Sequence, residues 1–179
     1  MKVFIVTVAV VILYSFIVVF ALDYRQAQIN SYCLKYVCEE LSSTGASFYD
    51  QEKFGEGYTV FNTEEGIKAI GDQITSILSI DSSLAPVSNS YWSKNMEYMV
   101  YFYDDSLKRK VYKDGYLERE ESFSYSQLHK DDWTSYDAVI SDPTVVVTIN
   151  AGPGRFRLKL VDPIPDIIRS SSHEWEAKK

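Results

Sequence analysis

The sequence predicts an α+β protein: a long N-terminal helix that is first transmembrane and then a stem, followed by a small antiparallel β-sheet domain with one or two short helices. Three observations lead to this prediction. Residues 3–22 carry no charge, residues 23–41 keep apolar side chains at helical spacing, and the second half of the chain concentrates β-branched and aromatic residues in short runs. The length of 179 residues suits one domain with an appendage.

The apolar run predicts a transmembrane anchor over residues 1–22. Only Thr7 and Ser15 interrupt it with weak polarity, and a helix of this length spans about 30 Å, the thickness of the hydrocarbon core of a bilayer. Lys2 precedes the run and Asp23 follows it, so the positive-inside rule predicts a cytoplasmic N-terminus and an extracytoplasmic remainder. We expect a retained anchor. Cleavage after Ala21, as in a secretory signal peptide, is the alternative.

Residues 23–45 are predicted to form a helical stem that continues the transmembrane helix. No proline or glycine occurs before Gly45, and Ile29, Cys33, Val37 (or its neighbour Tyr36) and Leu41 recur every three or four residues. A short break near the membrane surface is the alternative. We take Ile29, Cys33 and Val37 as a possible interface, because they share one helical face.

The extracytoplasmic α+β domain is predicted over residues 46–168, with a flexible tail at 169–179. Asn62 and Glu65 form a capping box that begins a short helix ending near Ser79. Asp114-Gly115 is a strong hairpin signal, and 132–140 is expected to be a short helix. The expected strands are 97–103, 110–112, 116–118, 144–150, 155–161 and 167–171, with 144–150 and 155–161 paired across the turn at Gly152.

Cys33 and Cys38 are the only cysteines. On a helix, five residues separate their side chains by about 140° and their Cα atoms by about 8 Å, which is beyond the reach of a disulfide. Either the helix breaks there, or the two residues do not pair with each other. Two buried packing residues are one interpretation, and a possible intermolecular disulfide through Cys33 or Cys38 is the other.

The sequence offers no candidate catalytic or metal-binding set, and we expect neither enzymatic activity nor a cofactor. His129 is expected in a polar loop and His173 in the tail, and neither has the spacing of a metal-binding helix. Neither Asp104-Asp105 nor Asp131-Asp132 has the alternating oxygen ligands of a calcium loop, and both pairs are expected to be solvated. The net charge of −7 argues against nucleic acid as a partner.

Tyr101 and Tyr103 are the candidate recognition residues, because both occupy one face of the expected strand at 97–103. Aromatic side chains with a polar tip are enriched at protein interfaces. Cross-strand packing explains the same residues equally well.

The layout resembles the TadE/TadF-like minor pilins and, more broadly, pseudopilins. The resemblance rests on the apolar run 3–22, the stem DYRQAQINSYCLKYVCEELSSTG, the expected strand pair around Gly152 and the closing IIRSSSHEWEAKK. The sequence departs from prepilins at two points: no glycine precedes the apolar run, and the run contains no glutamate. The resemblance therefore implies no functional residues.

These observations lead to two expected functions. The first is a non-enzymatic structural component of a membrane-anchored pilus-like or secretion apparatus, with the lipid bilayer and other protein subunits of an envelope assembly as partners. The second is a membrane-tethered or secreted extracytoplasmic module that binds a ligand or a protein through its aromatic strand. Both place the domain outside the cell membrane.

Overall fold

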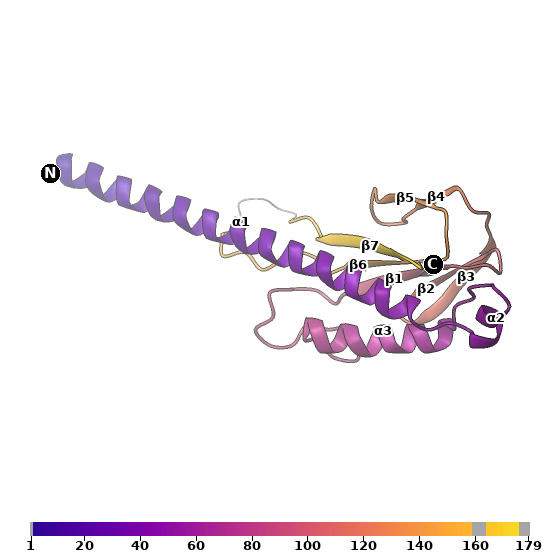
Figure 1. Ribbon diagram of the computed structural model, residues 1–179. Coiled ribbons are helices and arrows are strands. Elements are labelled where there is room, and N and C mark those ends of the chain that lie inside the picture. The colour runs from indigo at the N-terminus through magenta and orange to yellow at the C-terminus, as the bar shows by residue number, and fades with distance from the viewer. Residues whose placement is uncertain (1, 159–163, 176–179) are drawn as a thin grey trace.

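The computed structural model describes residues 2–158 and 164–175, and Figure 1 traces the chain through them. A single helix, α1 (Lys2–Ala46), forms the N-terminal quarter of the chain. Its first half projects away from the rest of the molecule, and its second half lies along the sheet (Figure 1). The helix passes through Asp23 without interruption, so the predicted continuous stem is confirmed and the alternative of a break is not observed.

The sheet is antiparallel with the strand order β3-β2-β1-β6-β7. Its strands are β1 (Glu97–Tyr103), β2 (Lys108–Lys113), β3 (Tyr116–Ser122), β6 (Thr144–Asn150) and β7 (Ile168–Glu174). Asp114 and Gly115 connect β2 to β3 with φ of 49° and 88°, the left-handed values that a tight two-residue hairpin turn requires. The predicted hairpin and the predicted α+β architecture are confirmed.

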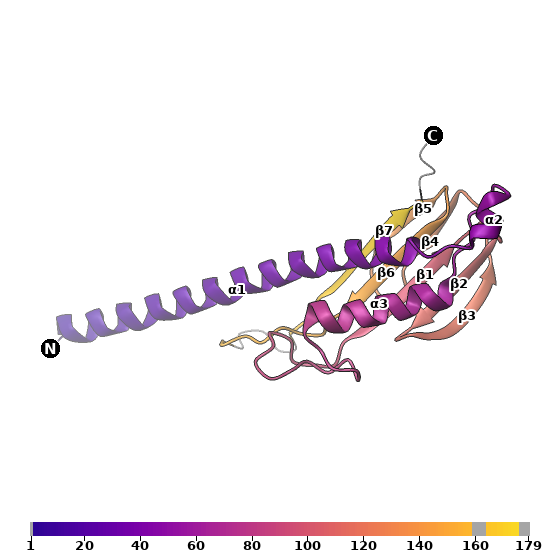
Figure 2. The same ribbon diagram turned by 60° about the horizontal axis from the view of Figure 1, so that its bottom comes forward.

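Two further helices precede the sheet: α2 (Gln51–Gly55) and α3 (Thr63–Leu78). The predicted cap is confirmed, because the Asn62 side chain accepts a hydrogen bond from the Glu65 N–H. Helix α3 lies beside α1 on the same face of the sheet (Figure 2). The two helices approach closely where Gly66 faces Gly45, since a Cβ on Gly66 would lie 3.3 Å from the Gly45 carbonyl oxygen.

The central strands of the sheet, β1 and β6, are buried on both faces. One face packs against α1 and α3, and its core includes Leu41, Ile70 and Phe102. The opposite face is covered by a small hairpin of β4 (Gln127–Lys130) and β5 (Asp137–Ile140), which is visible above the sheet in Figure 1. The core beneath this hairpin includes Tyr101 and Val146.

The structure corrects three expectations for the second half of the chain. The segment 132–140 is not a helix, because it forms a turn and strand β5, whose partner β4 was not predicted. The segment 155–158 is a loop and does not pair with β6, whose two edges are already taken by β1 and β7; residues 159–161 lie outside the described residues. The expected edge strand at 167–171 is β7, and it extends to Glu174, so part of the predicted tail is ordered within the sheet.

Candidate functional site

The second half of α1 has two faces of different character. Leu34, Val37, Cys38 and Leu41 are buried against the sheet and α3. Ile29, Tyr32 and Tyr36 lie on the opposite face, with exposed fractions of 46%, 65% and 67%. The spacing of three and four residues between these three side chains places them in one stripe along the helix. We call Ile29, Tyr32 and Tyr36 the stem stripe.

The first half of α1 is apolar around its whole circumference. It is long and apolar enough to cross a membrane, and none of its most apolar stretch is buried inside the molecule. The side-chain hydrogen bonds found for its residues 3–22, within the part of the chain that the structure describes, return to its own backbone, from Thr7 to the Val3 carbonyl oxygen and from Ser15 to the Val11 carbonyl oxygen. A helix that is apolar all round requires an apolar surrounding. A membrane-spanning or signal-anchor segment near the N-terminus meets this requirement.

The three residues predicted as a stem interface do not all lie on the surface of the molecule. Ile29 and Cys33 are exposed, whereas Val37 is buried against the domain, so Val37 belongs to the core and cannot contact another molecule. Tyr32 was not singled out from the sequence. The spacing from Ile29 to Tyr36 was the available signal, since a residue three positions after Ile29 falls on the same helical face.

The two cysteines differ in environment and do not pair with each other. Both are free thiols; Cys33 is exposed and Cys38 is fully buried. The Cys38 thiol donates a hydrogen bond to the Arg169 carbonyl oxygen at 3.2 Å, and burial raises its pKa to about 12. Cys38 is thus the predicted packing residue, and only Cys33 is accessible for an intermolecular disulfide.

Tyr101 and Tyr103 are not exposed. Their exposed fractions are 0% and 3%, because the β4–β5 hairpin covers this face of the sheet. Tyr103 packs edge-on against Phe123. Of the two interpretations of this strand, packing is the correct one, and the expected exposed aromatic face does not exist.

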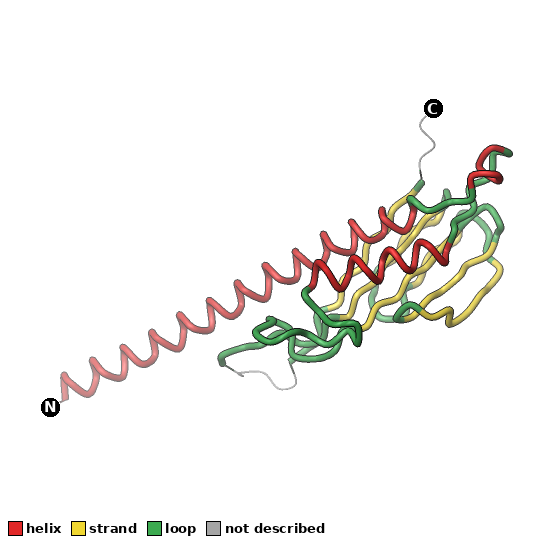
Figure 3. The backbone as a smooth tube through the Cα atoms, turned by 90° about the horizontal axis from the view of Figure 1, so that it is seen from below, coloured by secondary structure: helices red, strands yellow, loops and turns green. Residues whose placement is uncertain are grey.

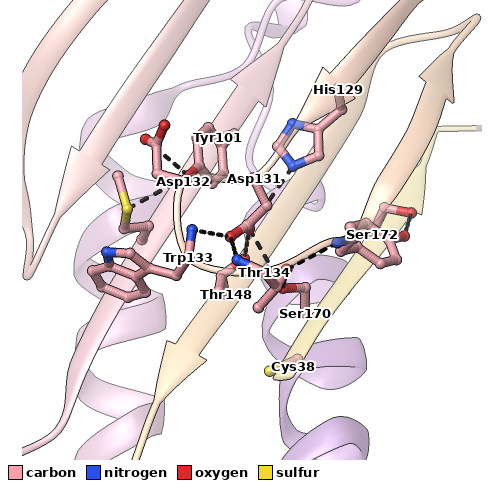
Figure 4. A network of polar contacts seen from close by, with 12 residues as sticks. Cys38, Tyr101, His129, Asp131, Asp132, Trp133, Thr134, Thr148, Ser170 and Ser172 are labelled. Carbon is pink, nitrogen blue, oxygen red and sulfur yellow. Dashed lines mark hydrogen bonds and ion pairs between the residues drawn. The ribbon is translucent and has the colours of Figure 1, made fainter. Parts of the chain in front are cut away.

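A buried polar network lies beneath the β4–β5 hairpin, and Figure 4 shows its members converging on Asp131. The Asp131 side chain has no exposed surface and accepts hydrogen bonds from the Trp133 and Thr134 N–H groups at 2.8 and 2.9 Å. The hydroxyl of Thr148, from β6, also donates to it. The expectation that Asp131 is solvated is therefore wrong, and so is the same expectation for Asp104, which is 2% exposed.

His129 completes this network and contacts it from β4. Its Nδ1 lies 2.7 Å from the Tyr103 hydroxyl, and its Nε2 lies 3.9 Å from Asp131 Oδ2. Burial raises the pKa of Asp131, but His129, the Thr148 hydroxyl and the two backbone N–H groups lower it by more, so the pKa lies below its ordinary value. The carboxylate is held ionised beneath the hairpin.

Tyr103, His129 and Asp131 contact one another in that order, and these three residue types have the composition of a proton relay. Their geometry, however, is that of a structural contact. The His129 side chain is fully buried. The hollow beside it measures about 80 Å³, room for only a few water molecules. The network therefore fastens the hairpin to the sheet: the Asp131 carboxylate holds the turn between β4 and β5 and bonds to β6.

Metal binding has no support within the described residues. No group of three or more His, Cys, Asp or Glu side chains is close enough to hold an ion in residues 2–158 and 164–175. His173 lies in β7, paired with Val145 of β6.

Two adjoining apolar surfaces of α1 are thus open to interaction: the apolar half, residues 3–22, and the stem stripe that continues from it. Comparisons of the chain with protein families, with curated proteins and with solved structures found no match.

Proposed function

We propose that the protein is a non-enzymatic structural subunit of a membrane-anchored assembly of the pilus-like or secretion type. In this proposal α1 crosses the cell membrane once, the sheet domain lies on the extracytoplasmic side, and neighbouring subunits pack laterally along α1. The single observation that supports it best is the stem stripe. Large apolar and aromatic side chains remain exposed on the helix face opposite the domain, directly in line with the apolar half.

Covering the stem stripe with a neighbouring chain would remove apolar surface from water. Ile29, Tyr32 and Tyr36 each keep about half or more of their surface exposed, and burying apolar surface contributes about 25 cal/mol per Å². Within the membrane, lateral association of helices depends on close packing instead, because lipid is as apolar as the side chains. One continuous helix offers neighbours both kinds of contact.

The orientation follows from the charges that flank the apolar half. Lys2 lies at the N-terminal end and all 25 acidic residues lie after residue 22. The positive-inside rule then places the N-terminus in the cytoplasm. A domain carrying the negative charge of the chain would lie outside.

The alternative of a binding module is not proposed. It depended on Tyr101 and Tyr103 as an exposed recognition surface, and both side chains are buried in the core. An enzyme is not proposed either, since the histidine–carboxylate pair of His129 and Asp131 is enclosed beneath the hairpin.

Photo-crosslinking in native cells tests lateral packing along α1. A photoreactive phenylalanine analogue is placed at Tyr36 of the stem stripe, and at Tyr116 of β3 as the matched control, since Tyr116 is also an exposed tyrosine. We expect Tyr36 to cross-link to a second protein chain and Tyr116 not to. Equal cross-linking at the two positions, or none at Tyr36, would overturn the proposal.

The N-terminal residue of the mature protein tests the anchor. We expect the chain recovered from its native cell to begin at Met1 and to resist extraction from membranes at alkaline pH. A chain that begins at Leu22 would mean that the apolar half is removed as a signal peptide, and α1 could then not hold neighbours together in the membrane.

A further inference from the structure

Asp23 fastens a loop of the sheet domain to α1 at the level where the apolar half ends. It follows Leu22 directly and is 7% exposed. Its Oδ2 accepts hydrogen bonds from the Arg157 and Leu158 N–H groups at 2.8 and 3.0 Å. Hydrogen bonds to a carboxylate are among the stronger ones in proteins. The loop 155–158 is therefore held beside the point at which the helix would leave the hydrocarbon core of a bilayer.

This loop is part of a built structure. The Arg155 N–H donates to the Tyr91 carbonyl oxygen at 2.8 Å, and Trp92 forms a β-bridge with Gly154. The Ser93 hydroxyl donates to the Pro153 carbonyl oxygen at 2.8 Å. Figure 3 shows the loops that follow α3 and β6 at the same end of the sheet, the end from which the first half of α1 projects. We call residues 91–94 and 152–158 the basal tip.

The side chains of the basal tip suit a lipid headgroup layer. Arg155 and Arg157 are exposed, and Phe156 and Leu158 are half-buried. Lys94 of the same tip pairs with Asp166 at 3.5 Å. Within the described part of the chain, neither Arg155 nor Arg157 forms an ion pair with a carboxylate within 4.0 Å.

We propose that Arg155 and Arg157 bind the phosphate groups of anionic lipids at the membrane surface from which the domain projects. This inference rests on the proposed function, since it requires α1 to cross the bilayer. The planar guanidinium group forms paired hydrogen bonds to phosphate, and basic side chains near an anionic surface are attracted to it. Together with α1, the two arginines give the domain a second point of attachment and fix its tilt on the membrane.

The test places a fluorescent label on the basal tip and measures its contact with lipid headgroups. The full chain carries Cys33→Ser, and a single cysteine is introduced by Phe156→Cys or, as a distal control on α2, by Gln51→Cys. Cys38 stays unlabelled because it is fully buried. Each protein is reconstituted into vesicles of phosphatidylcholine with or without phosphatidylglycerol, in which one lipid carries a nitroxide quencher on its headgroup.

We expect the label at position 156 to be quenched and the label at position 51 not to be. Labelled phosphatidylglycerol should quench more strongly than labelled phosphatidylcholine, with a local enrichment of up to about thirtyfold for two basic side chains. The enrichment should disappear at about 1 M salt, where the Debye length is about 3 Å. Arg155→Gln with Arg157→Gln should abolish it too, and leaves the Asp23 contact in place because that contact uses backbone N–H groups. The matched control Lys53→Gln with Lys68→Gln removes the same charge from exposed positions on α2 and α3 and should not change it.

Two results would overturn the inference while leaving the anchor intact: no quenching at position 156 in a protein that resists alkaline extraction, or quenching that is the same for both lipids and unaffected by the arginine substitutions. Extraction of the protein at alkaline pH, with neither label quenched, would instead show that α1 does not span the bilayer, and the proposed function would fail together with the inference.

Discussion

The substitution Leu41→Ala tests whether the second half of α1 is part of the domain core or a separate rod. Leu41 is fully buried, and it belongs to the cluster that α1, α3 and the sheet form together. If this cluster is one core, removing the side chain must destabilise the sheet domain and not only the helix.

The expected cost follows from the burial of Leu41. The substitution removes three carbon atoms, which lose about 2.4 kcal/mol of transfer free energy at about 0.8 kcal/mol for each buried methylene. The cavity left behind adds to this, and buried Leu→Ala substitutions cost about 3–5 kcal/mol in total. For a domain of about 150 residues this lowers the melting temperature by about 6–20 °C.

Near-ultraviolet circular dichroism of the purified full chain in detergent measures this effect. All three tryptophans lie after residue 90, so the aromatic signal of the sheet domain can be followed while the apolar half of α1 stays in the micelle. Ile29→Ala is the matched control on the same helix, because Ile29 is 46% exposed on the opposite face. We expect it to cost less than about 1 kcal/mol.

The comparison of the two variants decides the question. If Leu41→Ala lowers the melting temperature no more than Ile29→Ala does, the stem is not part of the domain core. The division of α1 into a core face and a neighbour-facing stripe would then be refuted.

Three further predictions concern the cysteines, the buried carboxylate and α3. At pH 8 a thiol reagent should modify Cys33 and not Cys38, since the Cys38 pKa of about 12 leaves only about one Cys38 side chain in ten thousand as the thiolate. Oxidised membranes should give a cross-linked dimer on non-reducing electrophoresis, which Cys33→Ser abolishes and Cys38→Ser does not. The pKa of Asp131 is lowered in the folded state, so the contribution of its carboxylate to stability is present above the unfolded pKa of about 4 and is lost as pH falls through the folded value. Asp131→Asn should lower the free energy of unfolding by about 1–3 kcal/mol at pH 7 and make urea unfolding less dependent on pH below about 4. An unchanged pH dependence would contradict this. Gly71→Ala should stabilise the protein by about 0.5–1 kcal/mol, because the new Cβ would meet only the Tyr98 hydroxyl at 3.6 Å; a lower melting temperature would contradict it.

The elements predicted correctly are those whose local signal and tertiary environment agree. Helix α3 has both a cap at Asn62 and apolar residues at helical spacing, and it is amphipathic in the structure as well. The β2–β3 turn contains the Asp-Gly pair that its backbone requires. In such segments the sequence carries enough local information for the prediction.

The errors arise where the neighbouring strands decide the structure. Residues 155–158 alternate between basic and apolar side chains as a half-buried strand would, yet both edges of β6 are occupied by β1 and β7, so no edge was available to them. The strand that does pair there, β7, contains three consecutive serines and has little apolar pattern. Pairing with β6 and contact with α1 stabilise β7, and no pattern within its own sequence predicts either contact.

Only part of the candidate site could be predicted from the sequence, for the same reason. The sequence showed that Tyr101 and Tyr103 share one face of β1, but burial of that face depends on the β4–β5 hairpin. That hairpin has polar residues at its turn and apolar residues such as Trp133 and Ile140 in its second part, and these apolar residues together with the buried contacts of His129 and Asp131 hold it in place. A partner for a strand face cannot be read from that strand alone.

In the proposed assembly, with α1 across the bilayer, the continuity of α1 would link the core of the domain to the arrangement of neighbouring subunits. Because one helix runs from Lys2 to Ala46, the face that Leu34 and Leu41 bury fixes the rotation of the whole helix about its axis, including the part in the membrane. Asp23 lies on this buried side and binds the basal tip there. The stem stripe must then continue on the opposite side, through Leu22 and Val18, into the bilayer. If the proposed assembly forms, packing of the domain selects which side of the anchor a neighbouring subunit meets, although the apolar run itself has no charged residue to distinguish one side from another.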